Sequence, residues 1–185
     1  MKTLVSAVLC AGMAAMAAAG AGPETAQAGK VWDQQFTQLE HELVPLAEAM
    51  PADKYGFAPT QGQFTGVRTF AQQVTHAAYV IYRMSAAILD EKNPSETDAN
   101  ENGPAALKTK GQIVQYLKDA FAYGHKAMRS LTNANQMDLV KSPFGQNRTA
   151  RVFMASLMMW HSFDHYGQMV VYLRMNGIIP PASRR

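Results

Sequence analysis

The most informative stretch of this chain reads Trp160-His161-Ser162-Phe163-Asp164-His165-Tyr166-Gly167-Gln168 and lies within a segment, about 149–175, that is typical of one long helix. On a helix of 3.6 residues per turn, His161 and His165 are one turn apart on the same face, so both imidazoles can bind one ion. The rest of this face is mainly apolar, which predicts that it is buried. Two imidazoles on a buried face indicate a metal site whose third ligand comes from elsewhere in the chain.

Three further segments repeat apolar residues at helical spacing. The first covers 30–50, and Pro45 would kink this helix or split it in two. The second begins at the capping box Thr69-Phe70-Ala71-Gln72 and runs to about Asp90, and the third covers about 105–131. Connections rich in Gly and Pro separate these segments, and none shows the alternation of a strand. Four such helices around one core predict an all-α four-helix bundle.

His76 is the natural third ligand if the second and fourth helices pack together. It lies beside the apolar stripe of the second helix, in line with Gln72, Val80 and Arg83. Three imidazoles leave a coordination position open, as catalytic zinc sites do. Ligation by histidine alone suits Zn first, with Ni and Fe(II) as alternatives. The competing interpretation is that these histidines are ordinary core or rim residues.

Other metal motifs do not match the residues of the fourth helix. A zincin has Glu directly after its first histidine, where this chain has Ser162, and the inverse motif has Glu where this chain has Asp164. Glu-x-x-His pairs for di-iron sites and Cys-x-x-Cys-His for haem are absent from the sequence. His41 and His125 fall in polar or mixed contexts and are expected to be surface or capping residues.

Residues near the histidine pair are candidates for supporting roles. Asp164 and Gln168 lie within one turn of the pair and could hold the second ring nitrogens or a bound water. Tyr166 and Tyr172 could line a pocket or donate protons. The candidate catalytic residues are therefore Asp164, Tyr166 and Gln168, beside the metal ligands His76, His161 and His165.

The first 28 residues are predicted to be a secretory signal peptide. Lys2 supplies a basic start, an apolar run follows, and Ala26-Gln27-Ala28 is an A-x-A cleavage signal, with cleavage after Ala21 as an alternative. The apolar run is shorter than the roughly 20 residues that span a bilayer, so cleavage is favoured over a stable membrane anchor. The chain then divides into a signal peptide, 1–28, and one domain, 29–185, in the periplasm or secreted.

Composition narrows the classes of function. The 185 residues with 48% hydrophobic content suit one domain with a full core. Cys10, the only cysteine, falls within the predicted signal peptide, so the domain has no thiolate ligand, disulfide or cysteine nucleophile. Losing Lys2 and Glu24 with the signal peptide leaves the formal net charge at +3, and the basic residues are scattered. We therefore expect no nucleic-acid partner.

Two groups of residues carry a family resemblance. One is His165-Tyr166-Gly167-Gln168 with Tyr172-Leu173-Arg174-Met175-Asn176-Gly177-Ile178-Ile179-Pro180-Pro181, and the other is Thr69-Phe70-Ala71-Gln72-Gln73-Val74 leading into His76. Together they resemble the DinB (DinB/YfiT-like) family, from about Val31 onward. The resemblance implies up-down-down-up topology and one divalent ion held by His76, His161 and His165. Related proteins are often dimers, so it also implies a homodimer.

The resemblance implies a range of functions. Characterised members of the family include metal-dependent thiol transferases and a mycothiol-dependent isomerase, in which the ion activates a small thiol. A signal peptide departs from the typical cytoplasmic member, and an oxidising exterior does not keep thiols reduced. We expect an exported three-histidine metalloprotein, a metal-dependent hydrolase or thiol transferase of unknown small-molecule substrate. The alternative is a non-catalytic extracytoplasmic protein that binds a metal or small ligand.

Overall fold

The computed structural model describes residues 25–60, 62–95, 97 and 100–184. Its four long helices are α1 (Ala28–Ala49), α2 (Phe70–Leu89), α3 (Lys110–Arg129) and α4 (Arg151–Met175). Short elements complete it: the 3₁₀ turns η1 (Ala52–Lys54) and η2 (Pro181–Ser183) and the strands β1 (Leu139–Lys141) and β2 (Arg148–Ala150). Residues 1–24, most of the predicted signal peptide, lie outside the described residues. No described helix is both long and apolar enough to cross a membrane.

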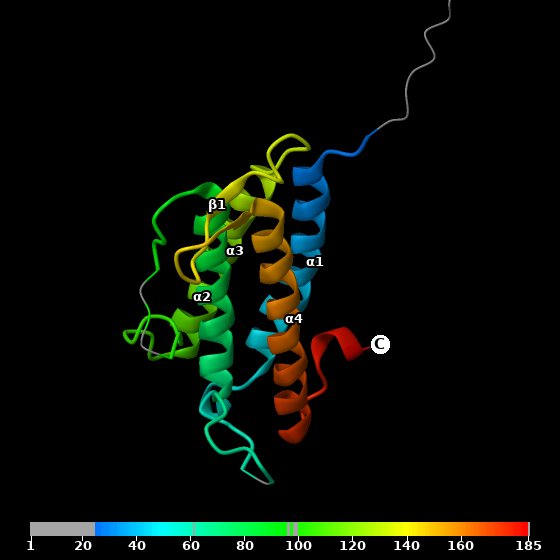
Figure 1. Ribbon diagram of the computed structural model, residues 1–185. Helices are drawn as coiled ribbons and strands as arrows, with labels where there is room; N and C mark the ends of the chain where they lie inside the picture. Colours follow the sequence, from blue (N-terminus) through cyan, green and yellow to red (C-terminus); the bar gives the residue numbers. More distant parts are fainter. Residues whose placement is uncertain (1–24, 61, 96, 98–99, 185) are drawn as a thin grey trace, which may run out of the picture.

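The four helices form a bundle in which α1 and α4 run one way and α2 and α3 run the other (Figure 1). Both α1 and α2 pack mainly on α3 and α4, so α1 lies diagonally opposite α2. This arrangement confirms the predicted four-helix bundle and its up-down-down-up order. It also brings α2 and α4 side by side, which is the contact that the predicted metal site requires.

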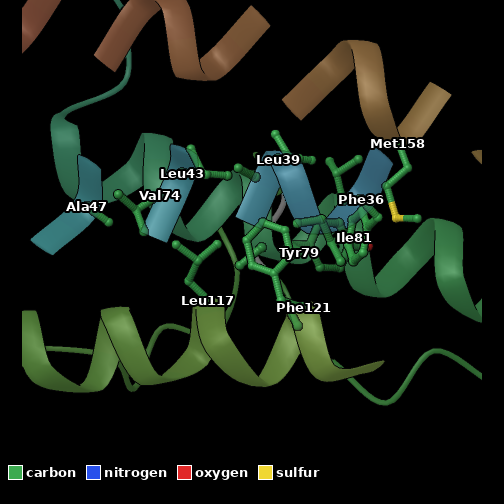
Figure 2. Packing of buried hydrophobic residues seen from close by; sticks show 14 of the residues in the cluster. Phe36, Leu39, Leu43, Ala47, Val74, Tyr79, Ile81, Leu117, Phe121 and Met158 are labelled. Carbon is green, nitrogen blue, oxygen red and sulfur yellow. The ribbon is translucent and has the colours of Figure 1, made fainter. Parts of the chain in front are cut away.

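The core consists of apolar side chains from all four helices (Figure 2). Phe36, Leu117, Phe121, Ile81 and Met158 are fully buried within it. Phe36 and Phe121 place their ring centroids 5.0 Å apart, a spacing at which aromatic rings attract each other. Burial of these side chains is the main source of the bundle's stability, because each removes a large apolar surface from water.

The starts of the helices follow local hydrogen bonds. Thr69 and Gln72 form the predicted capping box at the start of α2. A second capping box, of Thr109 and Gln112, starts α3 at Lys110, about five residues later than the sequence analysis placed it. Helix α1 continues past Pro45 to Ala49, so the alternative of a split helix is wrong. Because Pro45 has no N–H, the carbonyl oxygen of His41, four residues earlier, lacks its helical hydrogen bond. His41 is exposed, so water can reach this oxygen.

The structure adds to the bundle one short hairpin that the sequence pattern does not predict. Strands β1 and β2 pair antiparallel, with Leu139 opposite Ala150, in the connection between α3 and α4. Each strand has three residues, which is too short for the alternation that a sequence pattern needs. The hairpin leads directly into α4, since Ala150 precedes Arg151, the first residue of that helix.

The connection between α2 and α3 passes close to α2 near His76. Gly103 has a φ of +75°, and a Cβ there would lie 3.2 Å from the carbonyl oxygen of Thr75. Glu101 also has a positive φ, of 58°, a conformation that is uncommon outside glycine. This close approach places the backbone of residues 101–103 against the face of α2 that carries His76.

Candidate metal centre

The structure brings His76 of α2 together with His161 and His165 of α4. The Nε2 atom of His161 lies 3.1 Å from Nε2 of His76 and 3.1 Å from Nε2 of His165. His76 and His165 are buried, with 4% and 5% of their surface exposed, whereas His161 is half-buried. The three residues form a cluster that could hold a metal ion, and the spacing on the two helices had predicted this set.

A backbone carbonyl sets the tautomer of His76. Its Nδ1 lies 2.7 Å from the carbonyl oxygen of Glu101, in the connection that passes over α2. A carbonyl oxygen can only accept, so Nδ1 carries the proton and donates it. The Nε2 atom of a neutral His76 is then a bare lone pair, and it points toward the other two histidines.

A chain of side-chain hydrogen bonds sets the tautomer of His165. Asp164 accepts a hydrogen bond from Nε2 of Gln168, at 2.9 Å. Gln168 Oε1 accepts from Nε2 of Gln73, at 2.8 Å, and Gln73 Oε1 accepts from Nδ1 of His165, at 2.5 Å. Because a carboxylate only accepts, it orients both amides and leaves Nε2 of His165 unprotonated. We call Asp164, Gln168 and Gln73 the relay.

With these two tautomers, the cluster has fewer N–H donors than it has nitrogen lone pairs to satisfy. His76 and His165 each present a bare Nε2 to His161, and a neutral His161 has at most one Nε2–H to offer. At least one buried lone pair therefore has no donor among the described residues, which is unfavourable for a buried nitrogen. A cation between the three nitrogens would satisfy all of them. Two nitrogens bound tetrahedrally to zinc lie about 3.3 Å apart, close to the separations here. The residues present therefore fit a divalent ion.

All three imidazoles are held in the neutral form that binds metals. Burial, followed by the charges of the neighbouring histidines and of Arg68, lowers the pKa of His165 from 6.5 to about 3. Burial is also the main cause of the lowered pKa of His76 and His161, and the positive charge of Arg68 adds to it in both. At neutral pH a metal ion would not have to displace protons from this cluster.

The structure brings only some of the other candidate residues to the cluster. Asp164 and Gln168 act on it through Gln73, as parts of the relay. Tyr166 is directed away, to Glu42 of α1, and burial together with that hydrogen bond raises its pKa to about 12. Tyr172 donates to the carbonyl oxygen of Arg68, at 3.0 Å.

Gln73 and Glu101 hold two of the histidines but were not among the residues predicted from the sequence. Gln73 could have been found, because it lies three residues before His76 and therefore on a neighbouring face of α2. Glu101 acts through its backbone carbonyl, which any residue has, so nothing in its identity signals the role.

His125 lies elsewhere in the bundle. Its two ring nitrogens contact Asp33, at 2.6 Å, and Glu40, at 3.1 Å, both of α1. It therefore links α3 to α1 and takes no part in the three-histidine cluster.

Comparisons with known proteins agree with this fold. A family model described as the DinB superfamily matches residues 35–169. The structure resembles the crystal structure of a DinB-like protein from Bacillus cereus, with a TM-score of 0.65 and 14% sequence identity. That similarity covers 82% of this chain and 95% of the other, and at this identity it concerns the fold alone. A search of curated proteins finds no match.

Proposed function

The chain belongs to the DinB superfamily, and we propose that it is a metalloprotein in which His76, His161 and His165 hold one divalent cation, with zinc as the first choice and Ni or Fe(II) as alternatives. The observation that carries this proposal is the pair of fixed tautomers. Two buried Nε2 lone pairs converge on a third imidazole that can satisfy only one of them. A hydrogen-bonded core histidine would not be expected to lack a donor in this way.

Three histidine ligands would leave a coordination position open on a bound ion, which favours an enzyme over a protein that only captures metal. Gln168 is the side chain that could close the site as a fourth ligand, but its Oε1 already accepts from Gln73. His161 is half-buried and lines a cavity, so a small molecule could reach the cluster from that side. Catalytic zinc sites combine three protein ligands with such an open position.

The chemistry that we propose is metal-dependent hydrolysis or group transfer. A bound divalent ion would act as a Lewis acid, lowering the pKa of a water or thiol or polarising a substrate oxygen. The chain's own residues hold the imidazoles in place: the Glu101 carbonyl holds His76, and the relay holds His165. We further propose export to the periplasm or the exterior, as the signal peptide predicts. Hydrolysis is then favoured, because an oxidising exterior does not keep a thiol cosubstrate reduced.

An activity screen tests the enzymatic part of the proposal. The zinc-loaded protein would be assayed on panels of esters, amides and phosphoesters and for transfer of glutathione, beside chelator-treated protein and the His161→Ala variant. We expect turnover in at least one panel that is lost in both controls. Stoichiometric metal without turnover in any panel would instead favour the non-catalytic binding protein.

A further inference from the structure

The walls of the groove between α2 and α4 change character along its length. On α2, Gln72, His76 and Val80 follow one another along one face. Helix α4 runs antiparallel to α2 along this face. Gln168 of α4 is therefore at the polar end, with Gln72, and Leu157 is at the apolar end, with Val80. Glu101 lines a cavity on each side of the histidine cluster. A molecule lying in this groove would therefore meet polar groups on one side of the cluster and apolar groups on the other.

The polar cavity has a volume of about 610 Å³, and Arg68 is the one positively charged residue among those that line it. Its Nε donates to Oδ1 of Asn102, at 2.9 Å, and its Nη2 donates to the carbonyl oxygen of Asn100, at 2.8 Å. No described carboxylate pairs with Arg68, and its Nη1 has no described partner. Glu101, the acid at this cavity, forms its ion pair with Arg83 instead. Among the residues that the structure describes, the guanidinium of Arg68 therefore lines this cavity without a carboxylate partner of its own.

The apolar cavity has a volume of about 210 Å³ and is lined by His161 but not by Arg68. Its walls are mainly apolar and include Val80, Leu157, Phe144 and Trp160. Arg83 and Glu101 also line it, and they are paired with each other. Phe144 and Trp160 are 54% and 57% exposed, although large aromatic side chains are usually covered. A cavity of about 150 Å³ is large enough for benzene, so this one can hold a ring or a short alkyl chain.

We propose that this groove binds small molecules with a carboxylate at one end and an apolar group at the other. The carboxylate binds Arg68 in the polar cavity, and the apolar group packs against Leu157 and Trp160. Guanidinium and carboxylate match in charge and in geometry, which makes Arg68 selective for an anion over a neutral polar group. This inference rests on the proposed metal site and names the class of substrate that would lie across it.

The test uses three probes that separate charge from chain length: hexanoate, the neutral hexanamide and the short acetate. Each would be titrated into the cobalt-loaded protein, with binding followed by the visible absorption of cobalt, and into the metal-free protein by calorimetry. We expect hexanoate to bind at least about tenfold more tightly than either of the other probes, a factor that corresponds to about 1.4 kcal/mol.

Two variants test which residue binds the carboxylate of the ligand and which binds its apolar group. Arg68→Gln should weaken hexanoate at least about tenfold and leave hexanamide unchanged, because only the charge partner is lost. Trp160→Ala should weaken hexanoate toward the affinity of acetate and leave acetate unchanged. Arg174→Gln is the matched control, since it removes one positive charge from an exposed site on α4. Equal hexanoate affinity in Arg68→Gln and the parent would overturn the proposal.

A second substitution of Arg68 separates recognition from loop positioning, because Arg68 also holds residues 100–102. Arg68→Lys keeps the charge and should keep the preference for hexanoate over hexanamide. If Arg68 only positioned the loop, Arg68→Lys and Arg68→Gln would both lose metal affinity, with no change in that preference. Metal content measured in each variant keeps the two claims apart. Hexanoate selectivity without bound metal would contradict the metal site alone, whereas bound metal without hexanoate selectivity would contradict the ligand alone.

Discussion

The tautomer of His165 depends on a side chain that never touches the proposed ion. Gln73 Oε1 accepts from Nδ1 of His165, so removing this acceptor frees the imidazole to rotate or to change tautomer. Groups that orient metal-binding histidines typically contribute about 10- to 100-fold in metal affinity. We expect Gln73→Leu to weaken zinc binding by about that factor, measured by competition with a fluorescent zinc chelator.

Tyr166→Phe provides the control for Gln73→Leu. Tyr166 follows His165 in the sequence, but its hydroxyl donates to Glu42 of α1 and not to the cluster. Its loss should leave zinc affinity unchanged. Equal zinc affinity in Gln73→Leu and the parent would show that the relay does not position His165.

The lowered pKa of His165 makes the stability of the metal-free protein depend on pH. Its pKa is about 3 in the folded protein, mainly through burial, against 6.5 for an ordinary histidine, so the unfolded chain binds the proton more tightly. The contribution of the neutral imidazole to the free energy of unfolding is therefore complete above about pH 6.5 and is lost as the pH falls from there toward 3.

We expect His165→Gln to reduce the fall in melting temperature of the metal-free protein as the pH is lowered from about 7.5 to about 4.5. Gly167→Ala, an exposed substitution on the same helix that removes no titratable group, serves as the control and should leave the pH dependence as it is in the parent. Parallel curves for the parent and His165→Gln would contradict the assignment of a strongly lowered pKa to His165.

The three histidines were predictable from the sequence because helical spacing fixes which side chains share a face. His161 and His165 are one turn apart, and His76 needed only the contact between α2 and α4. The contacts that hold them were harder to foresee. Gln73 was passed over beside the conspicuous His76, and the Glu101 carbonyl depends on the path of a loop that no side-chain pattern describes.

At the scale of elements, Gly124 allows α1 and α3 to pack closely. A Cβ at this position would lie 2.4 Å from Cζ of Phe36, a fully buried and rigid ring. Gly124→Ala should therefore lower the free energy of unfolding by about 1–3 kcal/mol, although alanine has the higher helix propensity. Urea denaturation followed by circular dichroism would measure the change.

Gly167→Ala provides the control for Gly124→Ala, because at Gly167 there is free space for the added methyl group. Gly167 lies in the middle of α4, is exposed, and has no atom within 4 Å of the position that a Cβ would take. Gly167→Ala should raise the free energy of unfolding by about 0.5–1 kcal/mol. The packing explanation fails if both alanine variants are stabilised.

The elements themselves were predictable to different degrees. The start of α2 followed from its capping box, since Thr69 and Gln72 satisfy backbone groups that only a helix start exposes. The start of α3 was placed too early, because the equivalent box at Thr109 was not recognised. Strands β1 and β2 were not predicted, because three residues in each strand are too few to show an alternating pattern of apolar and polar residues.

At the scale of the molecule, the outer face of α4 is unusually apolar for an exposed surface. Phe153, Val171 and Met175 are each about half exposed and lie on this face at helical spacing. The exposed Trp160 and Asp164 lie between them on the same face. The family resemblance implied a homodimer, and this face would supply its interface. We expect the protein to elute as a dimer in size-exclusion chromatography with light scattering.

Charge substitution on that face tests the dimer. Val171→Asp should shift the protein toward the monomer, because a carboxylate would be buried in an apolar contact. Ile179→Asp is the control, at an exposed apolar residue that lies beyond α4. A monomeric parent, or a dimer that Val171→Asp leaves intact, would contradict an interface on α4.

The central claim is that His76, His161 and His165 hold one divalent ion, and the most direct test is metal content by mass spectrometry. The protein would be purified without a His-tag, reconstituted with Zn, Ni or Fe(II), and freed of loosely bound metal, beside His76→Ala and His165→Ala. We predict about one ion per chain in the parent and a nearly complete loss in both variants. A parent that retains no metal, or variants that retain as much as the parent, would contradict the claim.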